Sequence, residues 1–146
     1  MRNTLLGLHF LFTGSWLGCV VAIALCERVL LAGDRTSHLT LSTLHMRVDK
    51  FFEVPAILAA LTTGLILLLQ SHRVDMSFYV MAGAGLVAMV TNLYCVGLVT
   101  WRHRAAVAGR WSEFDQLDNK QHKLGAVVLL AMLLAFCAGI WGRGAA

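Results

Sequence analysis

Four long apolar runs, separated by polar segments, dominate the hydrophobic pattern of this chain. They cover residues 4–26, 51–70, 78–101 and 124–141. A helix needs roughly 20 mostly apolar residues to cross about 30 Å of hydrocarbon, and each run is close to that length. The pattern therefore predicts an all-α protein, an integral membrane four-helix bundle that forms one transmembrane domain over residues 1–146.

Two of the polar connections have a helical pattern of their own. Apolar side chains recur every third or fourth residue across about 39–50 and again across about 111–121. This spacing gives a helix one apolar face and one polar face. It predicts two amphipathic segments on the cytoplasmic membrane surface, each leading into or out of a span.

Composition agrees with a chain whose main solvent is lipid. Of the 146 residues, 58% are hydrophobic and only 14% are charged, which is too apolar for an ordinary soluble domain. The net charge of +4 comes from basic residues in loops beside the spans, where such residues usually report topology. We therefore expect contact with the lipid bilayer and no nucleic-acid partner.

The basic residues are distributed unequally between the two faces of the predicted bundle. The face with the two long connections has nine: Arg28, Arg35, Arg47, Lys50, Arg102, Arg104, Arg110, Lys120 and Lys123. The opposite face has three: Arg2, Arg73 and Arg143. Lys and Arg near span ends are retained on the cytoplasmic side, so the sequence predicts an N-out/C-out orientation.

His9 is the clearest candidate for a functional side chain inside the bilayer. Ionisable groups at membrane depth are costly unless they are paired or ligated. His9 shares a helix face with Thr13 and Trp16, and this face should point into the bundle together with Asn92 of the third run. One interpretation is a histidine hydrogen-bonded to a backbone carbonyl or a lipid headgroup. The other is an axial ligand of a b-type haem.

A second group of ionisable residues is expected near the cytoplasmic interface. His45, Asp49 and Glu53 are spaced by four residues, which can bring a nitrogen and two carboxylates together as a metal site. His122 lies at the start of the fourth helix, just before the fourth run, on the same side, and is a second candidate ligand beside His45. Solvated charge, with the acids paired to neighbouring basic residues, explains this group equally well. His9 lies on the order of 25 Å away by helix rise, so one haem cannot bridge the two levels.

Motifs in the first half of the chain resemble a family of small bacterial membrane proteins. They are Leu8-His9 followed by Trp16-Leu17-Gly18, the stretch Asp49–Leu58, and Leu61–Leu65. In these motifs the chain resembles the HemJ-type protoporphyrinogen oxidases and the related CopD-like copper-resistance proteins. The third-helix and fourth-helix motifs of the HemJ-type pattern are absent. The resemblance implies a compact four-helix membrane bundle and a b-type haem contacted by His9.

The hypothesis drawn from the sequence is a membrane haem protein in electron transfer or quinone-linked oxidoreduction, in a bacterial inner membrane. A second hypothesis is a HemJ-like oxidase, in which Arg47 or Lys50 steers the carboxylates of a bound porphyrin. A third is a copper-handling membrane protein, with His9, His45 and His122 as metal ligands. A fourth is a cofactor-free subunit of a larger membrane complex or homo-oligomer.

Overall fold

The protein is built of helices that are long and apolar enough to span a membrane. The computed structural model describes residues 1–30, 32–71 and 75–144, with backbone alone for 143 and 144. Within these residues four candidate spans occur, which confirms the predicted number and class of elements. The elements are α1 (Arg2–Leu30), α2 (Arg35–Val48), the π-helix η1 (Asp49–Glu53), α3 (Val54–Leu69), α4 (Met76–Val107) and α5 (Trp111–Gly144).

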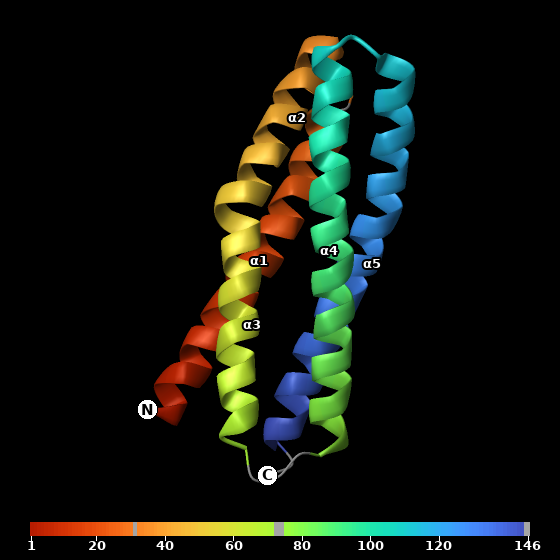
Figure 1. Ribbon diagram of the computed structural model, residues 1–146. Coiled ribbons are helices and arrows are strands. Elements are labelled where there is room, and N and C mark those ends of the chain that lie inside the picture. The colour runs from red at the N-terminus through yellow and green to blue at the C-terminus, as the bar shows by residue number, and fades with distance from the viewer. Residues whose placement is uncertain (31, 72–74, 145–146) are drawn as a thin grey trace.

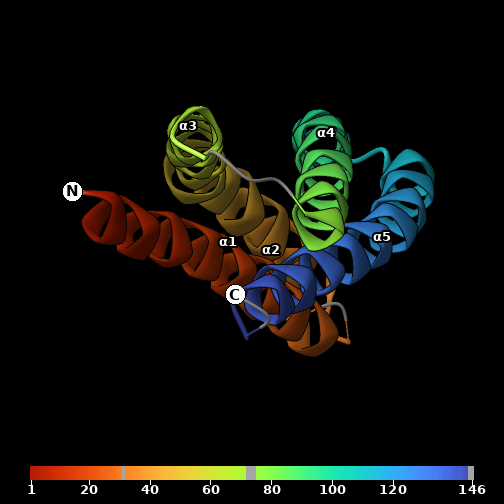
Figure 2. The ribbon, with the colours of Figure 1, turned by 90° about the horizontal axis from the view of Figure 1, so that it is seen from below.

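The helices lie side by side along one long direction, as Figure 1 shows. At one end, α1 is joined to α2 and α4 is joined to α5; we call this the connection end. The start of α1 and the end of α5 lie at the other, the terminal end. Viewed from the terminal end in Figure 2, α1 and α5 cross α3 and α4 at an angle. The most extensive contacts are those of α4 with α5, followed by those of α1 with α3.

The segment from Arg35 to Leu69 is one continuous helical rod with a π-turn in its middle. The backbone N–H of Val54 donates to the carbonyl of Asp49, five residues earlier, and Pro55 follows at the start of α3. Proline has no N–H and clashes with the carbonyl four residues before it, and a single π-turn accommodates that interruption without ending the helix.

The two amphipathic segments are helical, as predicted, and both are continuous with spans. Residues 39–50 belong to α2 and η1, and residues 111–121 form the first third of α5. Each segment continues without a break into the apolar run that follows it, at about residues 51 and 124. The apolar pattern marks the lipid-spanning part of each helix, whereas the helical hydrogen bonding continues through the polar part.

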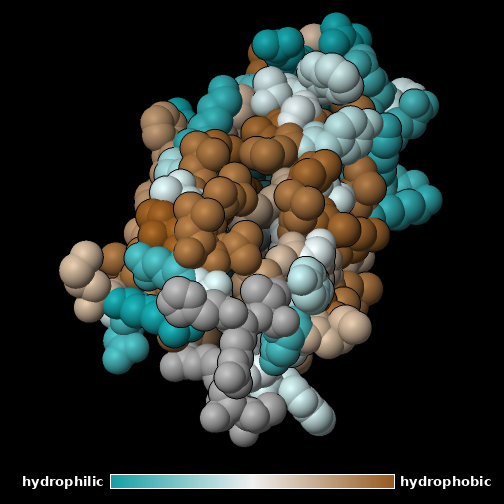
Figure 3. Space-filling model, turned by 60° about the horizontal axis from the view of Figure 1, so that its bottom comes forward, coloured by the Kyte–Doolittle hydropathy of each residue, from teal (hydrophilic) through white to brown (hydrophobic). Residues whose placement is uncertain are grey.

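The helices are longer than the hydrocarbon layer is thick. The 32 residues of α4 span about 48 Å, against about 30 Å of hydrocarbon. Side chains at the connection end therefore lie where the bundle leaves the hydrocarbon. Figure 3 agrees, with apolar side chains over the middle of the visible face, hydrophilic ones toward the connection end and a further hydrophilic group toward the terminal end.

A buried core ties all four long rods together near the middle of the bundle. Trp16 is its centre, packed with buried side chains of α3, α4 and α5, namely Ile57, Ala88, Val128 and Met132. A second buried cluster, Ala105, Ala106 and Phe114, closes the connection end where α4 meets α5. The turn between α4 and α5 contains Gly109 at φ +69°, a left-handed conformation that glycine adopts without strain.

Side-chain caps fix two helix starts in the polar connections. Asp34 accepts a hydrogen bond from the backbone N–H of Ser37 at the start of α2, at 2.9 Å. Asp75 does the same for Phe78 at the start of α4, at 3.0 Å. These hydrogen bonds lower the pKa of both carboxyl groups, because a carboxylate accepts them better than a neutral acid does. Arg73, one of the basic residues assigned to the terminal end, lies outside the described residues.

Candidate functional site

One ring nitrogen of His9 makes two hydrogen-bonding contacts with α3, and these hold the imidazole against that helix. Its Nδ1 lies 3.1 Å from the carbonyl oxygen of Ala60 and 3.0 Å from Oγ1 of Thr63. A carbonyl only accepts, and the Thr63 hydroxyl already donates to the carbonyl of Ala59 at 2.7 Å. Both partners therefore act as acceptors, and Nδ1 carries the proton. In this neutral tautomer the lone pair of Nε2 is available to bind another group.

Gly64 allows the imidazole to come this close to α3. A Cβ atom at position 64 would lie 3.1 Å from Cε1 of His9, closer than side chains ordinarily pack. Any residue larger than glycine would push against the ring and alter its orientation. The histidine is thus positioned by three successive features of one turn of α3: the carbonyl of Ala60, the hydroxyl of Thr63 and the bare backbone of Gly64.

Thr13 and Trp16, the two other candidates on the His9 face, have different surroundings. The hydroxyl of Thr13 donates to the backbone carbonyls of His9 and Phe10, within its own helix. Trp16 is 2% exposed and lies in the central core. Its indole N–H has no hydrogen-bond partner among the described residues, so this buried donor remains available to a bound group.

A buried polar cluster occupies the bundle toward the connection end, and Glu27 of α1 is its centre. We call it the Glu27 cluster; its members come from α1, α2, η1, α4 and α5, and are Glu27, His45, Asp49, Arg102, Asp118, Gln121 and His122. Glu27 lies about 27 Å along α1 from His9, by helix rise over 18 residues. The two predicted levels of ionisable residues are therefore found.

Arg102 of α4 pairs with two of the acids of the Glu27 cluster. Its side chain is completely buried, and Nη1 donates to Oε1 of Glu27 at 3.0 Å and to Oδ1 of Asp118. The guanidinium also lies 5.7 Å from the ring centre of Phe114. A buried charge is stable only when it is paired and hydrogen-bonded, and here one cation compensates carboxylates from two other helices.

His45 lies between two carboxylates. Its Nδ1 is 3.0 Å from Oε1 of Glu27, and its Nε2 is 3.4 Å from Oδ1 of Asp49. Two nitrogen donors also face Nδ1, namely Nη2 of Arg102 at 2.9 Å and Nε2 of Gln121 at 3.3 Å. Guanidinium and amide nitrogens only donate, whereas the carboxylate of Glu27 only accepts, so Nδ1 of His45 faces partners of both kinds. Nε2 of the ring faces Asp49.

The π-turn directs two acids inward. Asp49 and Glu53 are 2% and 3% exposed, and Oε2 of Glu53 accepts a hydrogen bond from the side-chain amide of Asn92 at 2.9 Å. Asn92 thus joins α4 to η1, in agreement with an interhelical role for an amide in a membrane. Oδ1 of Asp49 has no hydrogen-bond partner among the described residues, which is unusual for a buried carboxyl group.

The predicted inner histidines are brought together through Glu27. His122 Nε2 lies 3.3 Å from Oε2 of Glu27, while His45 contacts the other oxygen. No group of three or more His, Cys, Asp or Glu side chains in the described residues has a geometry that could hold a metal ion. The guanidinium of Arg102 stands among the acids where a metal cation would have to be.

Arg47 and Lys50 lie apart from both sites. Both side chains are exposed, and the acids that they were expected to neutralise are paired or buried elsewhere. Arg47 lines a shallow surface groove of about 400 Å³ on α2, together with Leu39, Thr40 and Leu44.

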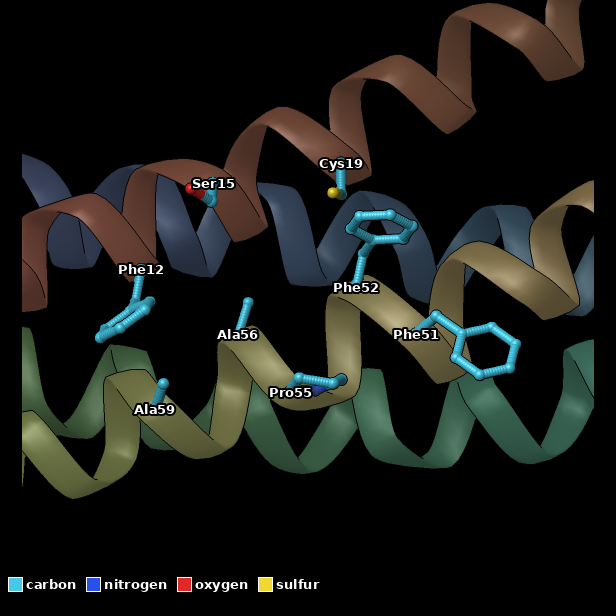
Figure 4. Close-up of a pocket in the computed structure, with 8 residues that line it drawn as sticks. All are labelled: Phe12, Ser15, Cys19, Phe51, Phe52, Pro55, Ala56 and Ala59. Carbon is cyan, nitrogen blue, oxygen red and sulfur yellow. The ribbon is translucent and has the colours of Figure 1, made fainter.

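A second groove, of about 390 Å³, runs between α1 and the η1–α3 segment. Figure 4 shows Phe12, Ser15 and Cys19 of α1 facing Phe52 and Ala56 of the opposite helix across it. Its lining is almost entirely apolar or aromatic, and the π-turn forms one end of it.

Sequence reasoning does not identify Arg102, Asp118 and Gln121 as members of a site. Arg102 directly follows an apolar run, as a topology-determining loop charge does. A usable signal is present nevertheless: Ala105 and Ala106 continue the apolar pattern of α4 past Arg102, which indicates that the helix and its buried face continue there.

Comparison of the chain with protein-family models, curated proteins and solved structures finds no match.

Proposed function

We propose that this protein is a membrane b-type haem protein that transfers electrons between a lipid-soluble donor, a quinol, and a partner, with His9 as an axial ligand through Nε2. The observation that carries the proposal is the hydrogen bonding of the other ring nitrogen. Nδ1–H donates to the carbonyl of Ala60 and to Thr63. Metal-binding histidines characteristically donate their second N–H to a carbonyl or a similar acceptor, which fixes the tautomer and the ring orientation.

The residues around His9 would hold a haem through this one imidazole. Thr63 and Gly64 position the imidazole, and the unpartnered indole N–H of Trp16 lies two turns deeper on the same helix. His45 and His122, which contact Glu27, are too far along the bundle to bind the same group. A haem bound at His9 would supply one-electron redox chemistry, and the protein would set its potential and access.

The groove between α1 and α3 is the proposed place for the lipid-soluble donor. Phe12 and Phe52 face across it, and it opens on the side of the bundle that lipid would cover. Apolar and aromatic walls suit the isoprenoid tail and planar ring of a quinol. The excess of basic residues at the connection end supports an orientation with that end in the cytoplasm and both termini outside. The resemblance of the first half of the chain to small bacterial membrane proteins supports a bacterial inner membrane.

One observation favours a second candidate, a HemJ-like porphyrinogen oxidase. Arg47 lines the groove on α2 beside apolar side chains, a combination suited to a planar apolar ring that carries carboxylates. Lys50, also exposed, lies less than one helical turn further along. This function would use the same His9 and is supported by the resemblance of the first half of the chain to that family.

An absorbance spectrum of the protein, purified in detergent from haem-replete cells and reduced with dithionite, tests the proposal. We expect a sharp b-type α-band that disappears in His9→Ala. His103→Ala is the matched control, because His103 contacts Ser42 and neither candidate site. Absence of the band in the wild type would contradict the haem proposal. An undiminished band in His9→Ala would show that His9 is not a haem ligand.

A further inference from the structure

The Glu27 cluster has a feature that ion pairing alone does not explain. Asp49 is buried, and its Oδ1 faces Nε2 of His45 at 3.4 Å, just beyond hydrogen-bond distance. That oxygen has no hydrogen bond within the described residues. A carboxyl group placed only for stability would be satisfied, because an unmade hydrogen bond in a buried site costs free energy. The π-turn that holds it is itself a conformation enriched at functional sites.

We propose that His122, Glu27, His45 and Asp49 form a proton-transfer path from the aqueous surface at the connection end to the buried π-turn. Neighbouring members of this series lie within 3.4 Å of each other, and the middle pair, Glu27 and His45, is hydrogen-bonded. His122 is the surface member, with 43% of its side chain exposed, and it is 3.3 Å from Oε2 of Glu27. The other oxygen of Glu27 is 3.0 Å from Nδ1 of His45, and Nε2 of the same ring faces Asp49.

The donor and acceptor roles of the side chains match transfer in this direction. Protonated His122 gives its Nε2 proton to Oε2 of Glu27. The carboxyl group of the resulting acid then rotates by half a turn, which brings this proton to the lone pair on Nδ1 of His45 in the tautomer that is protonated at Nε2. His45 then releases its Nε2 proton to Oδ1 of Asp49 and becomes the other neutral tautomer. One proton enters at the surface and one arrives at Asp49, and ring reorientation or tautomer exchange resets His45.

Every charged group around His45 bears on this path. The charged groups that act on His45 are Glu27 of α1, Asp49 and Glu53 of η1 and Arg102 of α4, and the amide of Gln121 of α5 is neutral. Arg102 also holds Glu27 in the ionised form. An excess proton is therefore carried through Glu27 and His45 rather than stored there. Asp49 is the site that receives it, because the guanidinium pairs with Glu27 and Asp118 instead.

The path ends beside the groove of α1 and α3. The π-turn that holds Asp49 also carries Phe51 and Phe52, which line that groove. Oxidation of a quinol releases protons, and the same four side chains, acting in the reverse order, would carry them from this place to the surface, which deepens the proposed function. The use by a quinol rests on that function, whereas the path itself depends only on the four side chains.

Time-resolved infrared spectroscopy after a pH jump tests the path in the full chain in lipid nanodiscs, without added haem. The carboxyl band of Asp49 is identified by its loss in Asp49→Asn. We expect Glu27→Gln, which keeps the side-chain shape, to slow protonation of Asp49 at least roughly tenfold, an increase of about 1.4 kcal/mol in the barrier. His45→Gln should do the same, and His103→Asn should leave the rate unchanged.

Two results would overturn the path. One is an Asp49 band that responds as fast in both Glu27→Gln and His45→Gln as in the wild type, with helix content verified by circular dichroism. The other is the absence of any pH-dependent carboxyl band that Asp49→Asn removes. The infrared experiment does not depend on haem, so a negative result contradicts the proton path and not the haem proposal. Conversely, the absence of a haem band in the absorbance spectrum contradicts the haem proposal and not the path.

Discussion

Replacement of Arg102 by methionine should destabilise the bundle far more than loss of any surface ion pair. Arg102 is completely buried and neutralises Glu27 and Asp118 from two other helices. Methionine fills a similar volume but leaves both carboxylates without their cation. Breaking a buried pair by removing one partner costs about 3–5 kcal/mol, because an uncompensated charge remains. For a chain of this size that corresponds to a fall in Tm of about 6–20 °C.

The assay is thermal unfolding in detergent, followed by circular dichroism at several pH values. Arg110→Met is the matched control, since Arg110 pairs with Glu113 on the surface with 58% and 48% of the two side chains exposed. Such exposed pairs contribute about 0–1 kcal/mol. The double variant Arg102→Met/Glu27→Gln should recover part of the loss, because it removes one of the stranded charges.

A result in which Arg102→Met is no more destabilising than Arg110→Met would refute the reasoning. It would mean that the carboxylates at the connection end are not held together by this guanidinium. The double variant also tests the reasoning. If Arg102→Met/Glu27→Gln is no more stable than Arg102→Met, the unpaired charge of Glu27 is not what destabilises the single variant.

Two further predictions concern single local features. Gly64→Val should displace the His9 ring, since even a Cβ at position 64 meets it at 3.1 Å; we expect a loss of about 1–3 kcal/mol in thermal unfolding, and unchanged stability would contradict the close packing. The carboxylate of Asp34 accepts a hydrogen bond from Ser37, which lowers the pKa of Asp34 below the ordinary value of about 4. The cap should therefore be intact above that value and weaken as the pH falls through the lowered pKa. Amide exchange at Ser37 should show this pH dependence in the wild type and lose it in Asp34→Asn.

The spans could be predicted from the sequence because lipid imposes a simple requirement on composition and length. Each apolar run coincides with one candidate span of the structure. The helix ends could not be predicted in the same way. The π-turn at Asp49–Glu53 connects α2 to α3 without a break, and nothing in local apolar periodicity distinguishes such a continuous rod from a surface helix followed by a turn.

The two levels of ionisable residues were predicted from position along the helices, whereas their partners were not. His45 and His122 were expected on the same side, and both contact Glu27. The identity of the cation that neutralises these acids depends on which faces of α4 and α5 meet. Arg102 and Asp118 lie on different helices, joined by a turn whose geometry depends on Gly109. Their contact is therefore set by tertiary packing, which the sequence alone does not predict.

The haem assignment depends on the tautomer and position of a single imidazole, and a haemin titration tests it most directly. Purified wild type, His9→Ala and His45→Gln are titrated in one detergent, and the Soret absorbance of the bound form is followed. We predict saturable binding of one haem per chain in the wild type and in His45→Gln, and its loss in His9→Ala. Equal binding by His9→Ala and the wild type, or no saturable binding by the wild type, would contradict the assignment.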